Sequence, residues 1–336
     1  MAGWVGMDSL MTHSLEGKRA LVTGAAGFIG ANLTRELIHH GADVHALVRS
    51  STRRWRIAEI APQITIHKAD LVEREALNRI LAEIRPELLF HLAVSGGHPQ
   101  LPEEREAFIK SSVLGTIYLL EALESLDVIN FVHVGSSLEY GPSERPLNES
   151  DRLAPLSFRG ASKAAATLIC RQYARDHKRP VIILRPFSVY GPWEAPTRLI
   201  PSAMRVALSG QPLLLTSPGY RHDFVYVKDV VEACLRAASG TFEPGEVINV
   251  GSGEQRSNEE VVELVQSVTG QRIAMRIGEY PARPFDTSHW VADIGKAEKL
   301  LGWRPRHTLR EGLEKTVSWF RQYAHAYDEE GSLRAD

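Results

Sequence analysis

Short apolar runs alternate with amphipathic stretches over the first half of the chain. The runs are four or five residues long and rich in Val, Ile and Leu, which is typical of strands buried on both faces of a parallel sheet. Between them, apolar residues recur three and four positions apart, which predicts helices. The predicted strands are 19–23, 44–48, 64–67, 88–92, 130–134 and 181–184, and the predicted helices are 28–40, 74–84, 104–126 and 162–177.

This alternation predicts an α/β fold built on a doubly wound parallel Rossmann sheet with right-handed crossovers. After residue 186 four prolines interrupt the rhythm, and helical patterns return at 227–238, 258–269 and 309–323. The later part therefore predicts a smaller C-terminal lobe. In an open α/β sheet ligands bind at the carboxyl ends of the strands, so this lobe is expected to bind substrate.

The same patterns divide the chain. We expect a disordered leader at 1–16, a cofactor-binding Rossmann domain at 17–190 with returns near 222–250, a substrate-binding lobe at 191–327 and a flexible tail at 328–336.

Composition narrows the class of protein. The chain has 336 residues, of which 43% are hydrophobic, enough for a sizeable core and too many for general disorder. Its formal net charge of −2 gives no attraction to nucleic acid or to an anionic membrane. No apolar run reaches the roughly 20 residues of a membrane helix, and the first residues do not resemble a signal peptide. The isolated Cys170 and Cys234 indicate reduced, buried thiols in a cytoplasmic protein.

A glycine-rich segment lies between the first predicted strand and the first predicted helix. Its sequence is Thr23-Gly-Ala-Ala-Gly-Phe-Ile-Gly30. Gly24 permits a tight turn, Gly27 lets backbone N–H groups approach a pyrophosphate, and Gly30 lets the helix pack on the sheet. The spacing has one more residue between the first two glycines than the usual dinucleotide fingerprint. Its place between strand and helix favours a phosphate-binding loop over an ordinary turn.

This segment resembles the opening motif of the extended short-chain dehydrogenase/reductase superfamily, whose members include NAD(P)-dependent nucleotide-sugar epimerases, dehydratases and ketoreductases. The resemblance continues in order over residues 15–323. Further matching segments are 69–71, 91–93, 114–116, 185–187, 189–192, 221–227 and 249–253.

The resemblance implies a set of cofactor contacts. Asp70 would accept a hydrogen bond from the adenine amino group, although an aspartate after a strand is also a common helix cap. Ala93 would line the path of the ribose. The implied cofactor-binding residues are Gly24, Gly27, Phe28, Ile29, Gly30, Arg49, Ser50, Asp70, Leu71, Ala93, Lys163 and Pro186.

The end of the second predicted strand bears on the choice between NADP and NAD. An NAD site places an acidic group about 20 residues beyond the glycines, to hold the ribose 2′-hydroxyl. Here Val48 is followed by Arg49 and two serines. An arginine with neighbouring hydroxyls would bind a 2′-phosphate, which favours NADP and leaves NAD as the alternative. Arg53, Arg54 and Arg56 are better explained as a solvated basic loop.

The resemblance implies a catalytic tyrosine, a lysine four residues later on the same helix face, and a serine that polarises the substrate oxygen. Ser136 and Lys163 occupy the serine and lysine positions, but the residue four before the lysine is Arg159. Arginine is a poor general acid because its pKa exceeds about 12, yet it can stabilise a developing alkoxide. Tyr140, Tyr190 and Tyr220 could supply the phenol instead, although packing is the better explanation for the first two.

The positions around the substrate also follow the resemblance. Ser137 and Leu138 stand where the 4,6-dehydratases have an Asp-Glu pair, so elimination of water is disfavoured and the segment looks like that of the 4-keto-6-deoxysugar reductases. Arg221 and Arg283 fall where the family's diphosphate-binding arginines lie, and two arginines suit a pyrophosphate. The implied substrate-binding residues are Ser95, Ser137, Ser188, Arg221 and Arg283. No metal site is expected, because His222 and His289 lack a paired ligand spacing.

These features together predict an NADP(H)-dependent enzyme that acts on a nucleotide-diphosphate sugar, most consistent with a 4-keto-sugar reductase. The alternatives are an epimerase or dehydratase with bound NAD, and a cofactor-binding sensor whose catalysis has decayed. The resemblance also implies a homodimer formed through the helices at 104–126 and 162–177. Neither nucleic acid nor membrane is expected as a partner.

Overall fold

The computed structural model describes residues 15–95, 101–283 and 285–324, with the side chain of residue 208 left out. The expected leader, apart from its last two residues, and the expected tail lie outside this part of the chain. No helix within the described ranges has the length and apolar character to cross a membrane.

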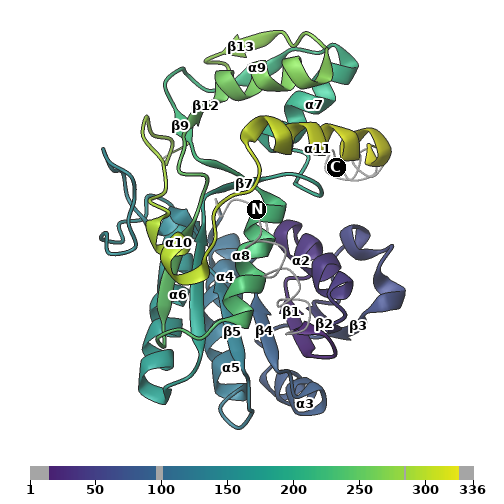
Figure 1. The fold of residues 1–336 in the computed structure, drawn as a ribbon, viewed down its shortest axis with the longest axis vertical. Coiled ribbons are helices and arrows are strands. Elements are labelled where there is room, and N and C mark those ends of the chain that lie inside the picture. The colour runs from purple at the N-terminus through teal and green to yellow at the C-terminus, as the bar shows by residue number, and fades with distance from the viewer. Residues whose placement is uncertain (1–14, 96–100, 284, 325–336) are drawn as a thin grey trace.

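A parallel sheet forms the centre of the molecule (Figure 1). In the described part of the chain it has seven strands in the order β11-β6-β5-β4-β1-β2-β3, and every neighbouring pair is parallel. The order reverses on either side of β1, as in a doubly wound Rossmann fold, which confirms the predicted fold class. The strands are β1 (Arg19–Thr23), β2 (Asp43–Val48), β3 (Thr65–Lys68), β4 (Leu88–His91), β5 (Asn130–Val134), β6 (Val181–Pro186) and β11 (Glu246–Val250).

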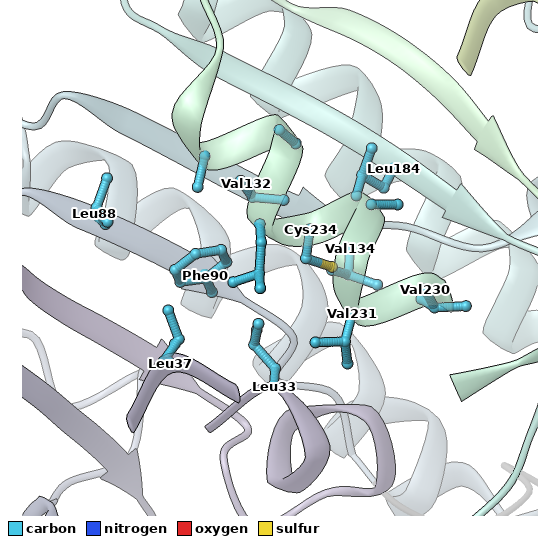
Figure 2. Close-up of a cluster of buried hydrophobic side chains, with 14 of the residues drawn as sticks. Leu33, Leu37, Leu88, Phe90, Val132, Val134, Leu184, Val230, Val231 and Cys234 are labelled. Carbon is cyan, nitrogen blue, oxygen red and sulfur yellow. The ribbon is translucent and has the colours of Figure 1, made fainter. Parts of the chain in front are cut away.

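One face of the sheet is covered by α2 (Phe28–His39), α8 (Val227–Ser239) and α10 (Gly295–Leu301). Figure 2 shows Leu33 of α2 and Cys234 of α8 meeting Phe90 of β4 in this core. Segments about 200 residues apart in sequence thus share one apolar layer, and this burial supplies most of the driving force for their association. Cys234 is buried and free, as predicted, and so is Cys170 on the opposite face.

The other face is covered by α3 (Arg74–Ile84), α5 (Gly115–Ala122) and α6 (Phe158–His177). The helix expected at 104–126 consists of α4 (Pro102–Ile109), a π-helical turn (Lys110–Leu114) and α5, and it ends four residues earlier. Gly115, the first residue of α5, explains the close packing there, because a Cβ at this position would lie 2.8 Å from the Leu71 Cβ.

The second half of the chain builds a lobe over the carboxyl ends of the strands, at the top of Figure 1. Its main helices are α7 (Leu199–Ser209), α9 (Asn258–Thr269) and α11 (Leu309–Tyr323), which pack on one another around a separate apolar core. Small paired strands complete it: β7 (Ser188–Tyr190) with β10 (Phe224–Tyr226), β8 (Leu213–Leu215) with β13 (Met275–Ile277), and β9 (Arg221–His222) with β12 (Arg256–Ser257).

Besides the small paired strands of the lobe, three further elements lie outside the predicted pattern. The strand β11 and the helices α7 and α10 were not expected from periodicity, because each is short or interrupted by polar residues. Trp303, just after α10, is fully buried in the sheet core and donates from Nε1 to the Asp229 carbonyl oxygen at 2.9 Å. Residues 297–303 therefore pack with the Rossmann sheet although they lie within the range expected for the lobe.

Candidate active site

The glycine loop makes a closed turn at the carboxyl end of β1. Gly24 has a φ of +74°, and a Cβ there would lie 2.8 Å from the backbone nitrogen of Ala93. A Cβ on Gly30 would lie only 2.2 Å from the Gly24 carbonyl oxygen. Only glycine fits these two positions, and Gly27 precedes α2 with extended backbone, so the N–H groups of the first turn, from Phe28 on, point out of the helix end. These observations fit a dinucleotide pyrophosphate at this helix end.

A hydrogen-bonded chain joins this loop to the neighbouring strand. The Thr23 hydroxyl lies 2.7 Å from Nδ1 of His91, and Nε2 of His91 lies 2.9 Å from the hydroxyl of Thr116. The backbone N–H of Ala93 donates to the Thr23 hydroxyl at 3.3 Å. Burial lowers the pKa of His91 to about 3, so the ring is neutral and acts as a positioning group for the segment that contains Ala93.

The residues expected at the adenosine end lie on neighbouring strand ends. Arg49 and Ser50 follow β2 and are exposed. Asp70, after β3, accepts from the Val72 backbone N–H at 3.2 Å, and so it shapes the turn before α3 without capping the helix, whose N-cap residue is Glu73. Leu71 is buried against Gly115.

The expected solvated basic loop is only partly exposed. Arg53 and Arg54 are exposed, but the prediction for Arg56 is wrong. Arg56 is half-buried and donates from Nε to the Trp193 carbonyl oxygen at 2.8 Å, with its guanidinium 4.3 Å from the centroid of the Trp55 ring. Trp193 itself has a φ of +69°. Arg56 therefore joins the β2–β3 connection to the chain that enters the lobe.

The serine and lysine segments meet at the carboxyl end of β5. Lys163 is buried, and its Nζ donates to the Val134 carbonyl oxygen at 2.8 Å. Ser136, the second residue after β5, caps the one-turn helix Ser137–Glu139, and its hydroxyl accepts from the Leu138 N–H at 3.2 Å. Burial, and next the charge of Arg159, lowers the pKa of Lys163 to about 8. This lysine can therefore exchange a proton near neutral pH.

Arg159 stands on the first turn of α6, one turn before Lys163. Ser157 caps this helix by accepting from the Gly160 N–H at 3.0 Å. A Cβ on Gly160 would lie 2.2 Å from the Leu138 carbonyl oxygen, so the start of α6 packs tightly on the one-turn helix after Ser136. Burial, and next the charge of Arg198, lowers the pKa of Arg159. No hydrogen bond or ion pair holds its guanidinium among the described residues.

Below these residues lies a buried network that sequence reasoning missed. Glu139 is fully buried, accepts from the Ser136 N–H at 2.8 Å, and pairs with Nε of Arg185 at 2.8 Å. Arg185 also donates to the Tyr140 hydroxyl, which donates to Asn249 of β11. Glu139 thus fixes the backbone at Ser136. The only signal in the sequence was an acidic residue three positions after the serine, the spacing of a capping box.

The candidate tyrosines differ in their surroundings. Burial raises the pKa of Tyr140 to about 12 and also raises that of Tyr190, whose hydroxyl donates to the Leu309 carbonyl oxygen at 3.2 Å. Both are almost fully buried, which confirms that they are packing residues. Tyr220, beside Arg221, remains partly exposed.

The two arginines expected to bind the diphosphate lie on adjacent segments. Arg221 in β9 donates its backbone N–H to the Thr287 carbonyl oxygen at 2.9 Å, which ties β9 to the loop that contains Arg283. The Arg221 guanidinium is 3.4 Å from a Glu260 carboxylate oxygen, and both side chains are exposed. The loop is closed by the Asp286 carboxylate, which accepts from the Arg283 N–H at 2.8 Å.

His222 marks where these groups converge. Burial lowers its pKa to about 4, opposed by Asp286 and reinforced by the charges of Arg198 and Arg283. Arg198 immediately precedes α7, and its Nε lies 3.6 Å from a carboxylate oxygen of Glu194. Within the described ranges no cluster of metal-ligating side chains occurs.

The remaining expected substrate residues lie around the same strand ends. Ser137 is buried and accepts from Nε1 of Trp290 at 3.2 Å, so its hydroxyl is already engaged. The backbone N–H of Ser95 donates to the Ser111 hydroxyl, and that of Ser188 donates to the Asp223 carbonyl oxygen. Pro186, at the end of β6, is buried.

The parallel order of the strands and the glycine turn at β1 define a Rossmann domain of the dinucleotide-binding class. The NAD dependent epimerase/dehydratase family matches residues 20–251 of the sequence. The chain belongs to this family, which is one of NAD-dependent nucleotide-sugar enzymes.

Individual relatives match over nearly the whole chain. A dTDP-glucose 4,6-dehydratase of Neisseria gonorrhoeae is 29% identical over 334 residues, which cover 91% of this chain and 96% of the relative. The solved structure of the epimerase Mth375 from Methanothermobacter thermautotrophicus is similar with a TM-score of 0.87, at 29% identity, covering 96% of this chain and 98% of that one. The UDP-glucuronic acid 4-epimerase of Bacillus cereus, solved with UDP-glucuronic acid and NAD, has a TM-score of 0.82 at 26% identity, covering 90% and 99%.

Proposed function

We propose that this protein is an NAD(P)-dependent enzyme that reduces the 4-keto group of a nucleotide-diphosphate sugar. The observation that carries the proposal is the placement of Ser136 and Lys163 at the end of β5, where Nζ of Lys163 donates to the Val134 carbonyl oxygen, in one sheet with the glycine turn at the end of β1. When bound at the glycine turn, a reduced nicotinamide would supply the hydride for the carbonyl carbon, and the carbonyl oxygen would take a proton from the protein. The protein's own residues bind, orient and protonate.

The roles of the chain's residues follow from their chemistry. The Ser136 hydroxyl polarises the keto oxygen, and its backbone is held by Glu139. Lys163, with a pKa of about 8, carries the proton near neutral pH. Arg159 takes the place of the tyrosine, and its permanent charge stabilises negative charge near the reacting carbon. Arg221 and Arg283 bind the diphosphate from two adjoining segments.

The cofactor residues fit either nicotinamide dinucleotide. The exposed Arg49 and Ser50 at the end of β2 favour NADP, since a guanidinium there can pair with a 2′-phosphate. An epimerase that keeps bound NAD is the second candidate, because the Bacillus cereus relative was solved with NAD.

One measurement separates these candidates. The nucleotide released from the heated protein is identified, and the absorbance of added NADPH or NADH is followed with a panel of keto-sugar nucleotides. The reductase consumes NADPH in proportion to substrate, while the epimerase releases NAD and interconverts two sugars without net consumption. Tight cofactor binding with no hydride transfer to any sugar nucleotide would contradict the proposal and leave a binding protein.

Two substitutions test the proton carrier. Lys163→Ala is expected to lower kcat by at least ~100-fold, the usual contribution of a positioned acid, while Lys228→Ala on the exposed side of α8 leaves kcat unchanged. Arg159→Tyr restores the residue that the superfamily resemblance implies. If activity rises in this variant, the arginine marks the loss of a catalytic tyrosine at residue 159. If activity falls, the arginine has a catalytic role of its own.

We also propose a homodimer formed through α4 and α6. These helices leave Ile109, Phe158 and Leu168 exposed on their surfaces. Light scattering of the purified protein would give the mass of two chains, and Leu168→Arg would give the mass of one.

A further inference from the structure

Asp223 is a fully buried carboxylate at which three segments of the chain meet. It lies between β9 and β10 and is 0% exposed. Its Oδ1 accepts from the backbone N–H and from the hydroxyl of Ser252, both at 2.6 Å. Its Oδ2 accepts from the backbone N–H of Gly253 at 3.1 Å and from that of Ala292 at 3.0 Å. One side chain thus joins the β9–β10 segment to the turn after β11 and to the loop before α10.

The four donors around Asp223 require an ionised carboxylate. A carboxylate has about four lone-pair sites on its two oxygens and no proton to donate, so four donors fill it. An asparagine would accept at one atom only and would present an NH₂ group to the remaining donors. Burial raises the pKa of Asp223 to about 6, and the hydrogen bonds oppose that shift. The side chain is therefore ionised above pH 7, and these hydrogen bonds make its buried charge tolerable.

The hydrogen bond to Ala292 bears on the position of Arg283. Arg283 begins a closed turn that ends directly before Thr287. The Thr287 carbonyl oxygen accepts from the Arg221 backbone N–H at 2.9 Å. The chain from Thr287 to Ala292 is therefore held at both ends by one short segment. The backbone of Arg221 holds the first end, and the carboxylate of Asp223, two residues later, holds the second.

The second contact fixes the direction of this chain as well as its position. A single hydrogen bond at Thr287 would let the Arg283 turn pivot about it, and the contact at Ala292 removes that freedom. The space there is closed, because a Cβ on Gly251 would lie 2.6 Å from Oδ2 of Asp223 and 2.6 Å from the Ala292 Cβ. A turn that is fixed before binding presents its arginine to a ligand without the cost of ordering a loop.

We propose that Asp223 is a positioning residue for substrate binding, which holds the Arg283 turn against β9 so that Arg283 and Arg221 contact the same diphosphate. This inference rests on the proposed function, because it assumes that the two arginines bind the diphosphate of a nucleotide sugar. It adds a residue that sets the affinity for the substrate. The affinity for the dinucleotide does not depend on it, since the glycine loop lies at the end of β1.

The test measures binding of nucleoside diphosphates to the dinucleotide-loaded full chain by isothermal titration calorimetry at pH 8, where Asp223 is ionised. UDP, dTDP, GDP, ADP and CDP are titrated first, and the one that binds most tightly is kept. Asp223→Asn is expected to weaken its binding at least ~10-fold, the effect of one lost charge-assisted contact. The affinity for NADPH and NADH, measured by fluorescence titration, stays within about threefold of the native value.

A double substitution separates positioning from a general loss of structure. If Asp223 acts through Arg283, Asp223→Asn weakens binding by no more than about threefold when Arg283→Gln is already present, because the group that it positions is gone. A purely structural role makes the two losses multiply, as independent changes do. Asp293→Asn is the matched control. The Asp293 carboxylate lies in the same loop but accepts from the Gly295 N–H and the Asn148 amide, so this variant should change neither affinity.

Gly251→Ala disturbs the same contact and leaves the carboxylate in place. The added carbon would enter between Asp223 and Ala292 and push them apart. We expect the same pattern as for Asp223→Asn: weaker binding of the nucleoside diphosphate, unchanged dinucleotide affinity, and little further loss when Arg283→Gln is present. Circular dichroism verifies that each variant is folded, and Gly251→Ala carries the test if Asp223→Asn does not fold.

The outcomes separate the two proposals. If no nucleoside diphosphate binds, or if Arg283→Gln leaves its affinity unchanged, the diphosphate site of the proposed function is overturned and this inference with it. If a nucleoside diphosphate binds through Arg283 but neither Asp223→Asn nor Gly251→Ala weakens it, the inference alone is overturned. Losses that multiply with that of Arg283→Gln, or a dinucleotide affinity that falls equally, would also overturn it, because Asp223 would then support the fold in general.

Discussion

The carboxyl ends of β1 and β5 owe their structure to different physical constraints. At the glycine loop between β1 and α2, the chain is constrained by space, because a single added carbon at Gly30 would meet the Gly24 carbonyl oxygen at 2.2 Å. At the turn between β5 and α6, the chain is constrained by charge. There Glu139 and Arg185 are 0% and 1% exposed and must satisfy each other.

The two constraints suit the two strand ends to different roles in the protein. The steric constraint leaves backbone N–H groups free for a phosphate and involves eight consecutive residues. The electrostatic constraint draws partners from α6, β6 and β11, and burial beside this network lowers the pKa of Lys163 to about 8. A change at the first end should therefore act on cofactor binding, and a change at the second on stability and pH dependence.

The largest effect is expected from breaking the buried ion pair. Glu139→Gln leaves the Arg185 guanidinium buried without a counter-charge, and losing one partner of such a pair costs ~3–5 kcal/mol in the free energy of unfolding. Urea denaturation measures it. The matched control is Glu254→Gln, whose exposed pair with Arg256 should contribute less than ~1 kcal/mol. Equal losses in the two variants would contradict the charge-based account of this end.

The pH dependence of the free energy of unfolding gives a second test at the end of β5, through Lys163. Its folded pKa of about 8 lies below the unfolded value of about 10.4, so the unfolded chain binds more protons between these values and stability rises with pH across that window. Lys163→Met removes this dependence. The variant should be more stable relative to the native protein at pH 7 than at pH 10.5, by about 3 kcal/mol. If the difference in the free energy of unfolding between the variant and the native protein does not change from pH 7 to 10.5, the pKa of Lys163 is not lowered in the folded protein.

Gly30→Ala tests the steric constraint at the glycine loop between β1 and α2. Forcing a methyl group against a backbone carbonyl is expected to cost ~1–3 kcal/mol of stability and to weaken dinucleotide binding at least ~10-fold, because the loop must shift. Thermal denaturation and fluorescence titration with NADPH and NADH measure the two effects. Gly210→Ala is the control: its φ is +70° but nothing lies within 4 Å of the added carbon, so stability falls slightly and cofactor affinity is unchanged.

The contrast also explains how much the sequence could predict. The six strands, the glycine turn and the order of the helices were readable, because local periodicity and local sterics decide them. Ser136 and Lys163 were placed through the superfamily resemblance, and in the structure Nζ of Lys163 donates to the Val134 carbonyl oxygen, two residues before Ser136. The missed strand β11 has polar residues at both Glu246 and Asn249, so its alternation was hidden until β6 paired with it.

What the sequence could not show depends on contacts between distant segments. Arg56 was expected in solvent, but Trp193, 137 residues away, supplies the carbonyl that binds it. Glu139 gave no sign of being paired, because Arg185 lies on another strand.

The smallest effect, and the most selective, is expected at Arg49, where neither space nor burial constrains the side chain. Because the guanidinium is exposed at the end of β2, Arg49→Ala should leave the free energy of unfolding unchanged. If the residue pairs with a 2′-phosphate, the variant loses ~10-fold in NADPH affinity and nothing in NADH affinity. Arg53→Ala, four residues further along the same exposed segment, is the control and should change neither. An unaltered ratio of the two affinities in Arg49→Ala would remove the case for NADP and favour the NAD-retaining epimerase.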